Sequence, residues 1–425
     1  MFSNLFKTVK SNQFSIDTFT LMVGTTISQA IPVVISPLLT RIYTPEDFGT
    51  FGLFTALTAI LGVFATGKYE LAIMLPKRDE DAVNIVALSI FLSLIVSFFL
   101  LILISFFNHS ITSIIGNTHI SLWLYFVPIS VLFTGAYQSL NYWSNRKGQY
   151  SRLSINRVAQ SGTAGIANLV MGWSGFTNAG LIMGTILGQG AATFILGKKV
   201  YKEDRNTINK INRTKIIDLS RRYIEFPKNT IFSSFTNTFY NNGRYLILGL
   251  VFTQNILGQF LLSFRALQMP VSIISTSIAD VLFQKTSLWY NLDLPKKSIF
   301  KKLYKILLIL MAIALFPALT LFFYGESLFS FVFGDKWALA GHFTSLLSLS
   351  LFFQFSFAPF CRVFYVLEKQ SLYLLWEVVR LIVVFAPVLI MGSMGYNYSN
   401  IVLVMSVNIS ISYILLFILL KRVLK

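Results

Sequence analysis

The chain has 425 residues, of which 55% are hydrophobic and only 12% are charged, whereas soluble domains carry about a quarter charged residues. This composition excludes a protein that folds around a single water-soluble core. In a soluble protein the net charge of +18 would suggest nucleic-acid binding. Here the basic residues fall between apolar runs, so the charge predicts orientation in a membrane and no nucleic-acid partner.

Apolar runs of about 18–25 residues, the length that crosses a bilayer, recur along the whole chain. They predict an all-α, polytopic membrane protein with about twelve transmembrane helices. No cleaved signal peptide is expected, because the start has no compact apolar stretch followed by a cleavage site. The predicted spans are residues 18–39, 48–66, 84–107, 120–140, 156–173, 178–197, 227–251, 255–284, 303–324, 337–360, 372–391 and 399–420.

The Lys and Arg residues test this topology. If the N-terminus is cytoplasmic, 29 of the 35 fall in cytoplasmic segments and two, Arg41 and Lys336, in outer loops. Basic residues accumulate on the cytoplasmic side of membrane proteins. The pattern therefore predicts an even number of helices with both termini in the cytoplasm.

A duplicated unit is indicated by similar motifs after the first span of each half. Residues 43–53, YTPEDFGTFGL, align with residues 252–262, FTQNILGQFLL. The sequence predicts an N-terminal six-helix lobe (1–197), a cytoplasmic basic linker (198–222) and a C-terminal six-helix lobe (223–425). Two six-helix lobes have the same orientation, so we expect pseudo-two-fold symmetry around a central cavity.

Polar side chains form stripes on the first two helices of each half, as seen by stepping about 100° per residue. On the seventh span the stripe contains Asn237, Tyr240, Asn241 and Arg244, and the second helix carries Gly52, Thr55, Thr58, Gly62 and Thr66. Ionisable residues at membrane depth usually face the bundle interior or water. The stripes therefore predict a hydrated, cationic cavity. Its candidate cations are Arg244, Arg265, Arg41 and Lys228, and its candidate polar residues are Asn237, Asn241, Tyr240, Gln268, Ser272 and Gln29.

Structural roles remain open for several of these residues. Ser, Thr and Gly at intervals of four often only pack helices closely, which applies to the second helix and to Gly180, Gly184 and Gly188. Arg244 could pair with a carboxylate as a structural lock. The Lys228 side chain could reach the cytoplasmic interface.

Catalytic motifs are absent from the sequence. There is no phosphate-binding G-x-x-x-x-G-K-[ST] loop, and His109, His119 and His342 lack metal-ligand spacing. The acidic RDED run at residues 78–81 is expected to be a solvated loop, because no nucleotide-binding domain surrounds it. We therefore expect no enzyme activity, no cofactor and no metal.

Several ordered motifs resemble bacterial O-antigen and polysaccharide flippases of the multidrug/oligosaccharidyl-lipid/polysaccharide superfamily. They include PLLTRIYTPEDFGTFGLF (37–54), GKYELAIMLPKRDEDA (67–82), YIEFPKNTIFSSFTN (223–237), LGQFLLSFRALQMPVSIISTSIADVLFQ (257–284) and FGDKWALAG (333–341). The resemblance implies a flippase in the bacterial inner membrane that translocates undecaprenyl-pyrophosphate-linked oligosaccharide outward by alternating access. Implied partners are the lipid-linked substrate, the bilayer, and a polysaccharide polymerase and chain-length regulator.

Two other functions remain open at this stage. One is a small-molecule exporter of the same superfamily. An exporter of cationic drugs would be expected to have an acidic cavity, whereas the cavity predicted here is basic. The other is a membrane polysaccharide polymerase. Polymerases of this kind are expected to have a large outer catalytic loop, whereas the longest predicted loop here is cytoplasmic.

The predicted topology can be tested with reporter fusions. Fusions after residues 205 and 425 should report the cytoplasm, and a fusion near Asn117 should report the outer side, because the basic segments stay inside. An external readout at residue 205 would contradict the twelve-helix topology.

Overall fold

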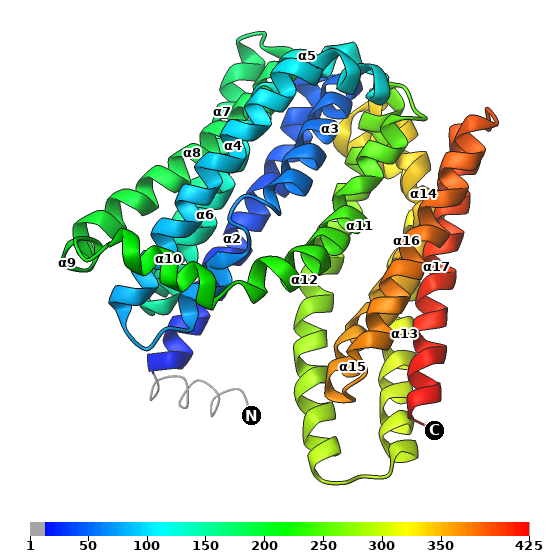
Figure 1. Ribbon diagram of the computed structural model, residues 1–425. Helices are drawn as coiled ribbons and strands as arrows, with labels where there is room; N and C mark the ends of the chain where they lie inside the picture. Colours follow the sequence, from blue (N-terminus) through cyan, green and yellow to red (C-terminus); the bar gives the residue numbers. More distant parts are fainter. Residues whose placement is uncertain (1–12, 425) are drawn as a thin grey trace. The chain divides into compact units, whose positions relative to one another are not determined.

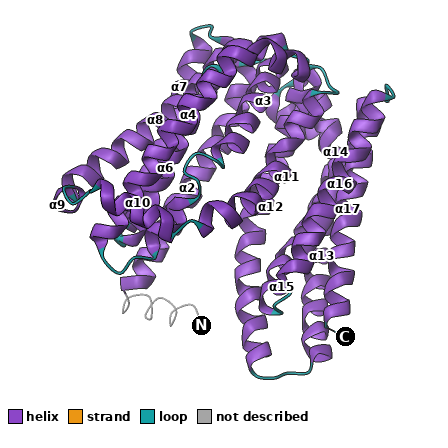
Figure 2. Ribbon diagram, in the orientation of Figure 1, coloured by secondary structure: helices purple, strands orange, loops and turns teal. Residues whose placement is uncertain are grey.

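The computed structural model describes residues 13–424 as helices joined by short loops, with no strand among these residues (Figures 1 and 2). The N-terminal segment, for which no cleaved signal peptide is predicted, begins outside them. The chain divides into two units, Met1–Leu246 and Ile247–Lys425, here called the N-terminal unit and the C-terminal unit.

The N-terminal unit is a helical bundle in which α7 packs against both α2 and α8, while α6 packs against α3, α4 and α8. Proline is tolerated inside α2, at Pro32 and Pro37, because neighbouring helices can satisfy the freed backbone groups. Its elements are α2 (Gln13–Ile42), α3 (Pro45–Gly62), η1 (Tyr69–Met74), α4 (Asp79–Ile115), η2 (Thr118–Ile120), α5 (Ser121–Leu124), α6 (Val127–Arg146), α7 (Tyr150–Trp173), α8 (Thr177–Glu203), α9 (Arg205–Ile208), α10 (Arg213–Arg222), the π-helix η3 (Phe226–Thr230) and most of α11 (Ile231–Gly249).

In the C-terminal unit, α14 packs against α12, α13 and α17, and α16 packs against α17. The amide of Gln268 on α12 exchanges two hydrogen bonds with that of Gln354 on α14 (2.7 and 3.0 Å). The elements are α12 (Gln254–Asn291), α13 (Lys296–Phe333), η4 (Asp335–Trp337), α14 (Ala338–Phe357), η5 (Ala358–Arg362), α15 (Val363–Val366), α16 (Gln370–Ser393) and α17 (Tyr398–Val423).

The two aligned motifs begin equivalent helices. Thr44 caps α3, where its hydroxyl accepts from Asp47 N and Asp47 accepts from Thr44 N, and Pro45 follows at the first helical position. Thr253 occupies the same N-cap position before α12. Thr and Pro favour helix starts, so this repeat marks where the second helix of each half begins.

Eight helices among the described residues are long and apolar enough to span a membrane, or nine if the bent pair Thr118–Leu124 and Val127–Arg146 forms one span. The chain is therefore a multi-pass membrane protein. Each of the twelve predicted ranges overlaps a helix. The ranges in α3, α7 and α11 do not meet the apolar criterion, because polar residues interrupt them. The count of twelve spans stays a prediction.

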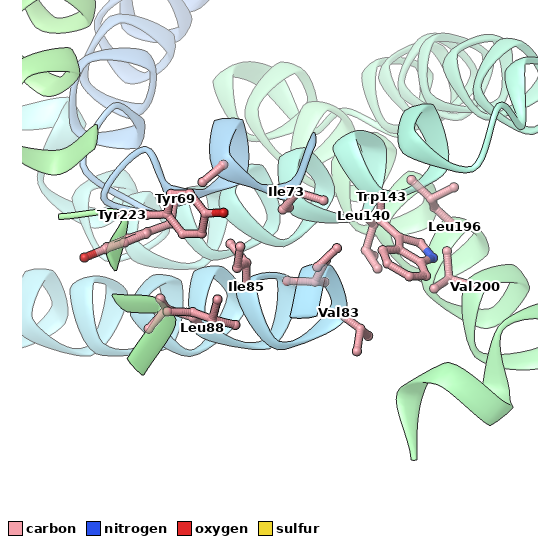
Figure 3. Packing of buried hydrophobic residues seen from close by; sticks show 14 residues of the cluster. Tyr69, Ile73, Val83, Ile85, Leu88, Leu140, Trp143, Leu196, Val200 and Tyr223 are labelled. Atoms are coloured by element: carbon pink, nitrogen blue, oxygen red, sulfur yellow. The ribbon is translucent and has the colours of Figure 1, made fainter. Parts of the chain in front are cut away.

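One end of the N-terminal unit is held together by an apolar cluster and a set of ion pairs. The cluster joins η1, α4, α6, α8 and α10 through residues that include Tyr69, Ile85 and Trp143 (Figure 3). Around it, Asp79 accepts from Arg146 and Lys147 (2.9 Å each). Segment 198–222, predicted as a linker, is thus helical and packs on this unit through α10. The predicted lobe boundaries remain a prediction.

The acidic run 78–81 differs from a solvated loop. Asp79, Glu80 and Asp81 form the first turn of α4, where negative charge is favourable beside the helix N-terminus. Lys215 on α10 lies 3.6 Å from Glu80 and 3.5 Å from Asp81. The acids therefore fasten the basic segment after α8 to the bundle.

Helices α7 and α8 approach so closely that glycine is needed between them. A Cβ atom on Gly188 would lie 2.7 Å from Ala164 Cβ and 2.8 Å from Gln160 O, whereas one on Gly162 would meet nothing within 4 Å. The prediction that Gly188 serves helix packing therefore has a direct geometric basis.

Gly188→Ala should lower the thermal stability of the purified full-length protein by about 1–3 kcal/mol, because the backbone of α7 must shift to admit the methyl group. The matched variant Gly162→Ala should be neutral or slightly stabilising, since alanine favours a helix. Equal melting temperatures for the two variants would contradict the close packing.

Candidate substrate cavity in the N-terminal unit

A polar cavity of about 320 Å³, here called the threonine cavity, lies within the N-terminal unit. Four helices line it, and most of the contributed side chains are hydroxyls or amides. Because this unit belongs to a membrane protein, uncharged polar groups around a cavity replace part of the hydration that a polar ligand would lose in hydrocarbon. The lining residues are Phe54, Thr55, Thr58, Ala59, Gly62, Val63, Lys68, Thr134, Gln138, Thr185, Gln189 and Thr238.

Three polar atoms from lining residues are buried without a hydrogen-bond partner among the described residues. They are Thr58 Oγ1, Gln138 Oε1 and Gln189 Oε1. Buried polar atoms in folded proteins are nearly always hydrogen-bonded, so each such atom requires an explanation. Two amide oxygens and a hydroxyl can accept hydrogen bonds from a hydroxyl-bearing ligand or from water.

A second cavity of about 440 Å³ shares Lys68 and Gln138 with the first and is here called the tyrosine cavity. Aromatic rings, amides and two charged groups line it, and Asn141 Nδ2 donates to Tyr137 Oη (3.3 Å). Its lining residues are Lys68, Glu70, Leu71, Tyr137, Gln138, Asn141, Tyr142 and Ser234.

Lys68 and Glu70 form an ion pair at the junction of the two cavities. Lys68 Nζ lies 3.7 Å from Glu70 Oε1, and the two side chains are 14% and 3% exposed. Thr66 Oγ1 donates to the second carboxylate oxygen of Glu70. Lys68 ends a turn with an unusual backbone, because Gly67 and Lys68 both adopt left-handed conformations (φ 58° and 63°), and Glu70 lies in the first turn of the following η1.

The segment after this loop is fixed to neighbouring elements. Tyr69 Oη donates to Ser220 O on α10 (2.8 Å), and Arg146 Nη1 on α6 donates to Ile73 O (3.1 Å). Burial raises the pKa of the Tyr69 phenol above its ordinary value, which keeps it a neutral donor. In Figure 3, Tyr69 and Ile73 lie among the buried cluster at this end of the unit. The turn at Gly67 and Lys68 is therefore followed by a segment, η1, that is fixed to α6 and α10.

Comparison with known families gives a decisive match. The family described as "Polysaccharide biosynthesis protein" matches residues 38–341, which include every residue that lines the two cavities. The chain belongs to this family. A comparison with curated proteins finds no match.

Solved structures show the fold of this family member. Lipid II flippase MurJ in an inward closed conformation aligns with a TM-score of 0.73 at 13% identity, covering 94% of this chain and 87% of that chain. An inward-facing multidrug resistance MATE family transporter of the MOP superfamily gives a TM-score of 0.68 at 14% identity, covering 95% and 98%. A MOP superfamily transporter from Pyrococcus furiosus Vc1 gives 0.56 at 15% identity, covering 95% and 94%.

These alignments establish that this chain has the two-lobed, all-helical fold of MOP superfamily transporters. The predicted fold class is thereby confirmed, apart from the exact number of spans. The resemblance recognised in the motifs at residues 37–54 and 257–284 is also confirmed, at the level of family and fold.

The predicted stripe on α11 is divided between buried and exposed positions. Arg244 is 5% exposed, and its guanidinium donates to Asn241 O (3.0 Å) and Tyr240 O (3.1 Å) and lies over the Tyr240 ring. Asn237 and Asn241 are exposed, and Asn241 Nδ2 donates to Asn237 Oδ1 (2.8 Å). These contacts link the stripe residues along one side of α11.

A different side of α11 meets the cavities, because Ser234 and Thr238 are the lining residues there. They lie about 100° around the helix from Ser233 and Asn237. None of the ten predicted site residues is among the lining residues of the threonine or the tyrosine cavity. Whether the predicted stripe faces a central cavity stays a prediction.

The other predicted residues have varied surroundings. In the C-terminal unit, Arg265 and Gln268 are half-buried and Ser272 is exposed, with its hydroxyl donating to Met269 O (2.9 Å). In the N-terminal unit, Arg41 and Lys228 are exposed and Gln29 is half-buried. Sequence reasoning did not select Lys68, Glu70, Gln138 or Gln189. The sequence did contain an indication of them. Gln138 and Gln189 each lie inside a predicted span, and Lys68 and Glu70 lie in the GKYEL motif.

The threonine cavity should admit water. In a Cys361→Ser background, which removes the one native thiol, Thr185→Cys should react with a small hydrophilic thiol reagent, because the residue lines the cavity. The neighbour Ile186→Cys should resist, since Ile186 is only 5% exposed and is not a lining residue. The measurement is the labelled fraction of folded protein, and equal labelling of both sites would contradict a hydrated cavity.

Proposed function

We propose that this polysaccharide biosynthesis protein is a flippase that moves undecaprenyl-pyrophosphate-linked oligosaccharide from the inner to the outer leaflet by alternating access. The observation that carries the proposal is the set of three unpartnered polar atoms on Thr58, Gln138 and Gln189 in the threonine cavity. Family membership supplies the sugar context. The MOP-superfamily fold supplies a membrane transporter framework.

The chemistry of the lining suits a sugar. A saccharide head group cannot cross hydrocarbon unaided, because its hydroxyls would lose their hydrogen bonds to water. Amide and hydroxyl side chains offer replacement bonds that are individually modest, about 0.5–1.5 kcal/mol each. Such bonds allow the head group to enter and also to leave, as a carrier requires. The lipid tail can remain in the bilayer throughout.

The charged part of the substrate requires cations. Arg244, Arg265, Arg41 and Lys228 are proposed to meet the pyrophosphate during transport, with Asn237, Asn241, Tyr240, Gln268, Ser272 and Gln29 as polar partners. A guanidinium matches phosphate oxygens in a bidentate geometry. Arg244 holds its guanidinium against its own helix in this conformation, so its proposed contact requires a change of rotamer.

The same proposal assigns the cellular setting. We place the protein in the bacterial cytoplasmic membrane with both termini in the cytoplasm, as the distribution of basic residues predicts. A polysaccharide polymerase and a chain-length regulator would act on the translocated unit. Outward movement of about two negative charges would gain on the order of 4–5 kcal/mol per 100 mV if they cross the full field. No step requires covalent catalysis by this chain.

Gln189→Met tests the role of the cavity. Methionine keeps the volume of the side chain but removes a buried oxygen without a partner among the described residues, so thermal stability should stay equal or rise. Export of lipid-linked sugar, normalised to folded protein, should fall about 3- to 10-fold, as expected for one lost hydrogen bond of roughly 1 kcal/mol.

Gln149→Met, at an exposed position after α6, is the matched control and should leave export unchanged. Cells lacking the chain should lose surface polysaccharide, and the unaltered protein should restore it. Full export by a well-folded Gln189→Met protein would remove the threonine cavity from the substrate path. Continued surface polysaccharide in cells without the chain would contradict the flippase itself.

A further inference from the structure

Lys68 and Glu70 differ from every other residue around the two cavities because they are charged. Among the lining residues of the threonine and tyrosine cavities, Lys68 is the only basic residue and Glu70 the only acidic one. Lys68 lines both cavities. A cation at this junction can reach a ligand in either of them.

The backbone conformation at position 68 is unusual for a residue with a long side chain. A left-handed backbone favours glycine and is uncommon for a residue with a long side chain. Gly67 supplies such a residue, yet the next position, with φ 63°, is lysine. Strained non-glycine residues concentrate at ligand sites, where the surrounding structure enforces them. The hydrogen bond from Lys68 N to Thr66 Oγ1 (3.3 Å) is part of that structure.

The Lys68–Glu70 pair is a loose one. Its 3.7 Å separation exceeds the 2.7–2.9 Å typical of a short charge-assisted hydrogen bond. Glu70 is held separately by the Thr66 hydroxyl. An ammonium group has three donors, so one carboxylate at this distance does not exhaust its capacity. Glu70 therefore acts as an internal counter-ion rather than as a tight lock.

We propose that Lys68 is an anion-binding subsite of the cavity and that Glu70 is the anion it holds between transport events. The ligand is an acidic group on the head of the lipid-linked saccharide, either its pyrophosphate or the carboxylate of an acidic sugar. This inference rests on the proposed function. It adds a specific cation, and a competitor for it, inside the N-terminal unit.

The predicted topology places this subsite where the substrate starts. Segment 67–83 is assigned to the cytoplasmic side by the charge distribution. The phosphates of a lipid-linked sugar in the inner leaflet lie at that interface, and its sugar can extend into the adjoining cavities. Displacement of Glu70 from Lys68 by the incoming anion would keep the lysine paired, and the released Glu70 carboxylate would retain its hydrogen bond from the Thr66 hydroxyl.

The test measures anion binding to the purified full-length protein in lipid nanodiscs. The probes are geranyl pyrophosphate and glucuronic acid, and the variants are Lys68→Gln, Glu70→Gln, Lys68→Arg and the control Lys202→Gln, which alters an exposed cation at the end of α8. Lys68→Gln should weaken binding of the preferred probe on the order of tenfold, as for loss of a charge-assisted bond. Lys68→Arg should retain it, and the control should not change it.

Glu70→Gln gives the sharpest result, because an anion subsite and a structural ion pair predict opposite changes in anion affinity for this variant. Removal of the competing carboxylate should strengthen anion binding, whereas a structural pair would make both single variants bind more weakly and melt earlier. If Lys68→Gln fails to fold, the comparison of Glu70→Gln with Lys68→Arg still decides. Weaker binding in Glu70→Gln, or unchanged binding in a folded Lys68→Gln protein, would overturn the proposal.

The two probes separate the sources of the anion. A response to geranyl pyrophosphate alone assigns the subsite to the pyrophosphate, a response to glucuronic acid alone assigns it to an acidic sugar, and a response to neither overturns it. Failure here is distinct from failure of the proposed function. A chain that restores surface polysaccharide in cells while its binding is insensitive to Lys68 would remain a flippase without this subsite.

Discussion

The absence of water in the hydrocarbon core of a bilayer is the constraint on which this structure depends. Backbone groups must then be satisfied within the protein, which leaves helices as the elements of a bundle that crosses the membrane. The described chain consists of helices and short loops. The same constraint sorts the side chains, because a polar group at membrane depth must pair or line a hydrated space. Helices α6 and α11, which are among the less apolar long helices, both line the threonine cavity.

Charge in the N-terminal unit is concentrated at one end of the bundle. The acids at the start of α4 pair with Arg146, Lys147 and Lys215, and Arg152 pairs with Asp204 (3.4 Å). These ion pairs join the α6–α7 turn and the segment after α8 to the rest of the unit. None of these paired residues lines either cavity, and the charged lining residues are Lys68 and Glu70. A single cation and its neighbouring carboxylate then carry the electrostatics of that space.

In the proposed function, an uncharged polar lining and a local cation have separate roles in recognising a lipid-linked sugar. Hydroxyls and amides such as Thr58 and Gln189 accept hydrogen bonds that are weak enough to be exchanged with water. In the proposed subsite, Lys68 would meet a charged group, for which loss of water is most expensive. Separate sites for these two tasks would let the sugar vary while the handling of charge stays constant.

The sequence by itself determined the class of the protein, because apolar run length and the position of Lys and Arg depend on the bilayer and not on packing. Twelve ranges, each of which overlaps a helix, could be predicted in this way. The site could not. A stripe on a helix shows that one side is polar, yet it does not show which neighbour that side meets. On α11 the stripe through Asn237 was visible, whereas Ser234 and Thr238 line the cavities. Gln138, Gln189 and Lys68 are far apart in the chain and gather only through the packing of α3, α6 and α8. Such long-range contacts depend on tertiary structure, because no local pattern of residues specifies them.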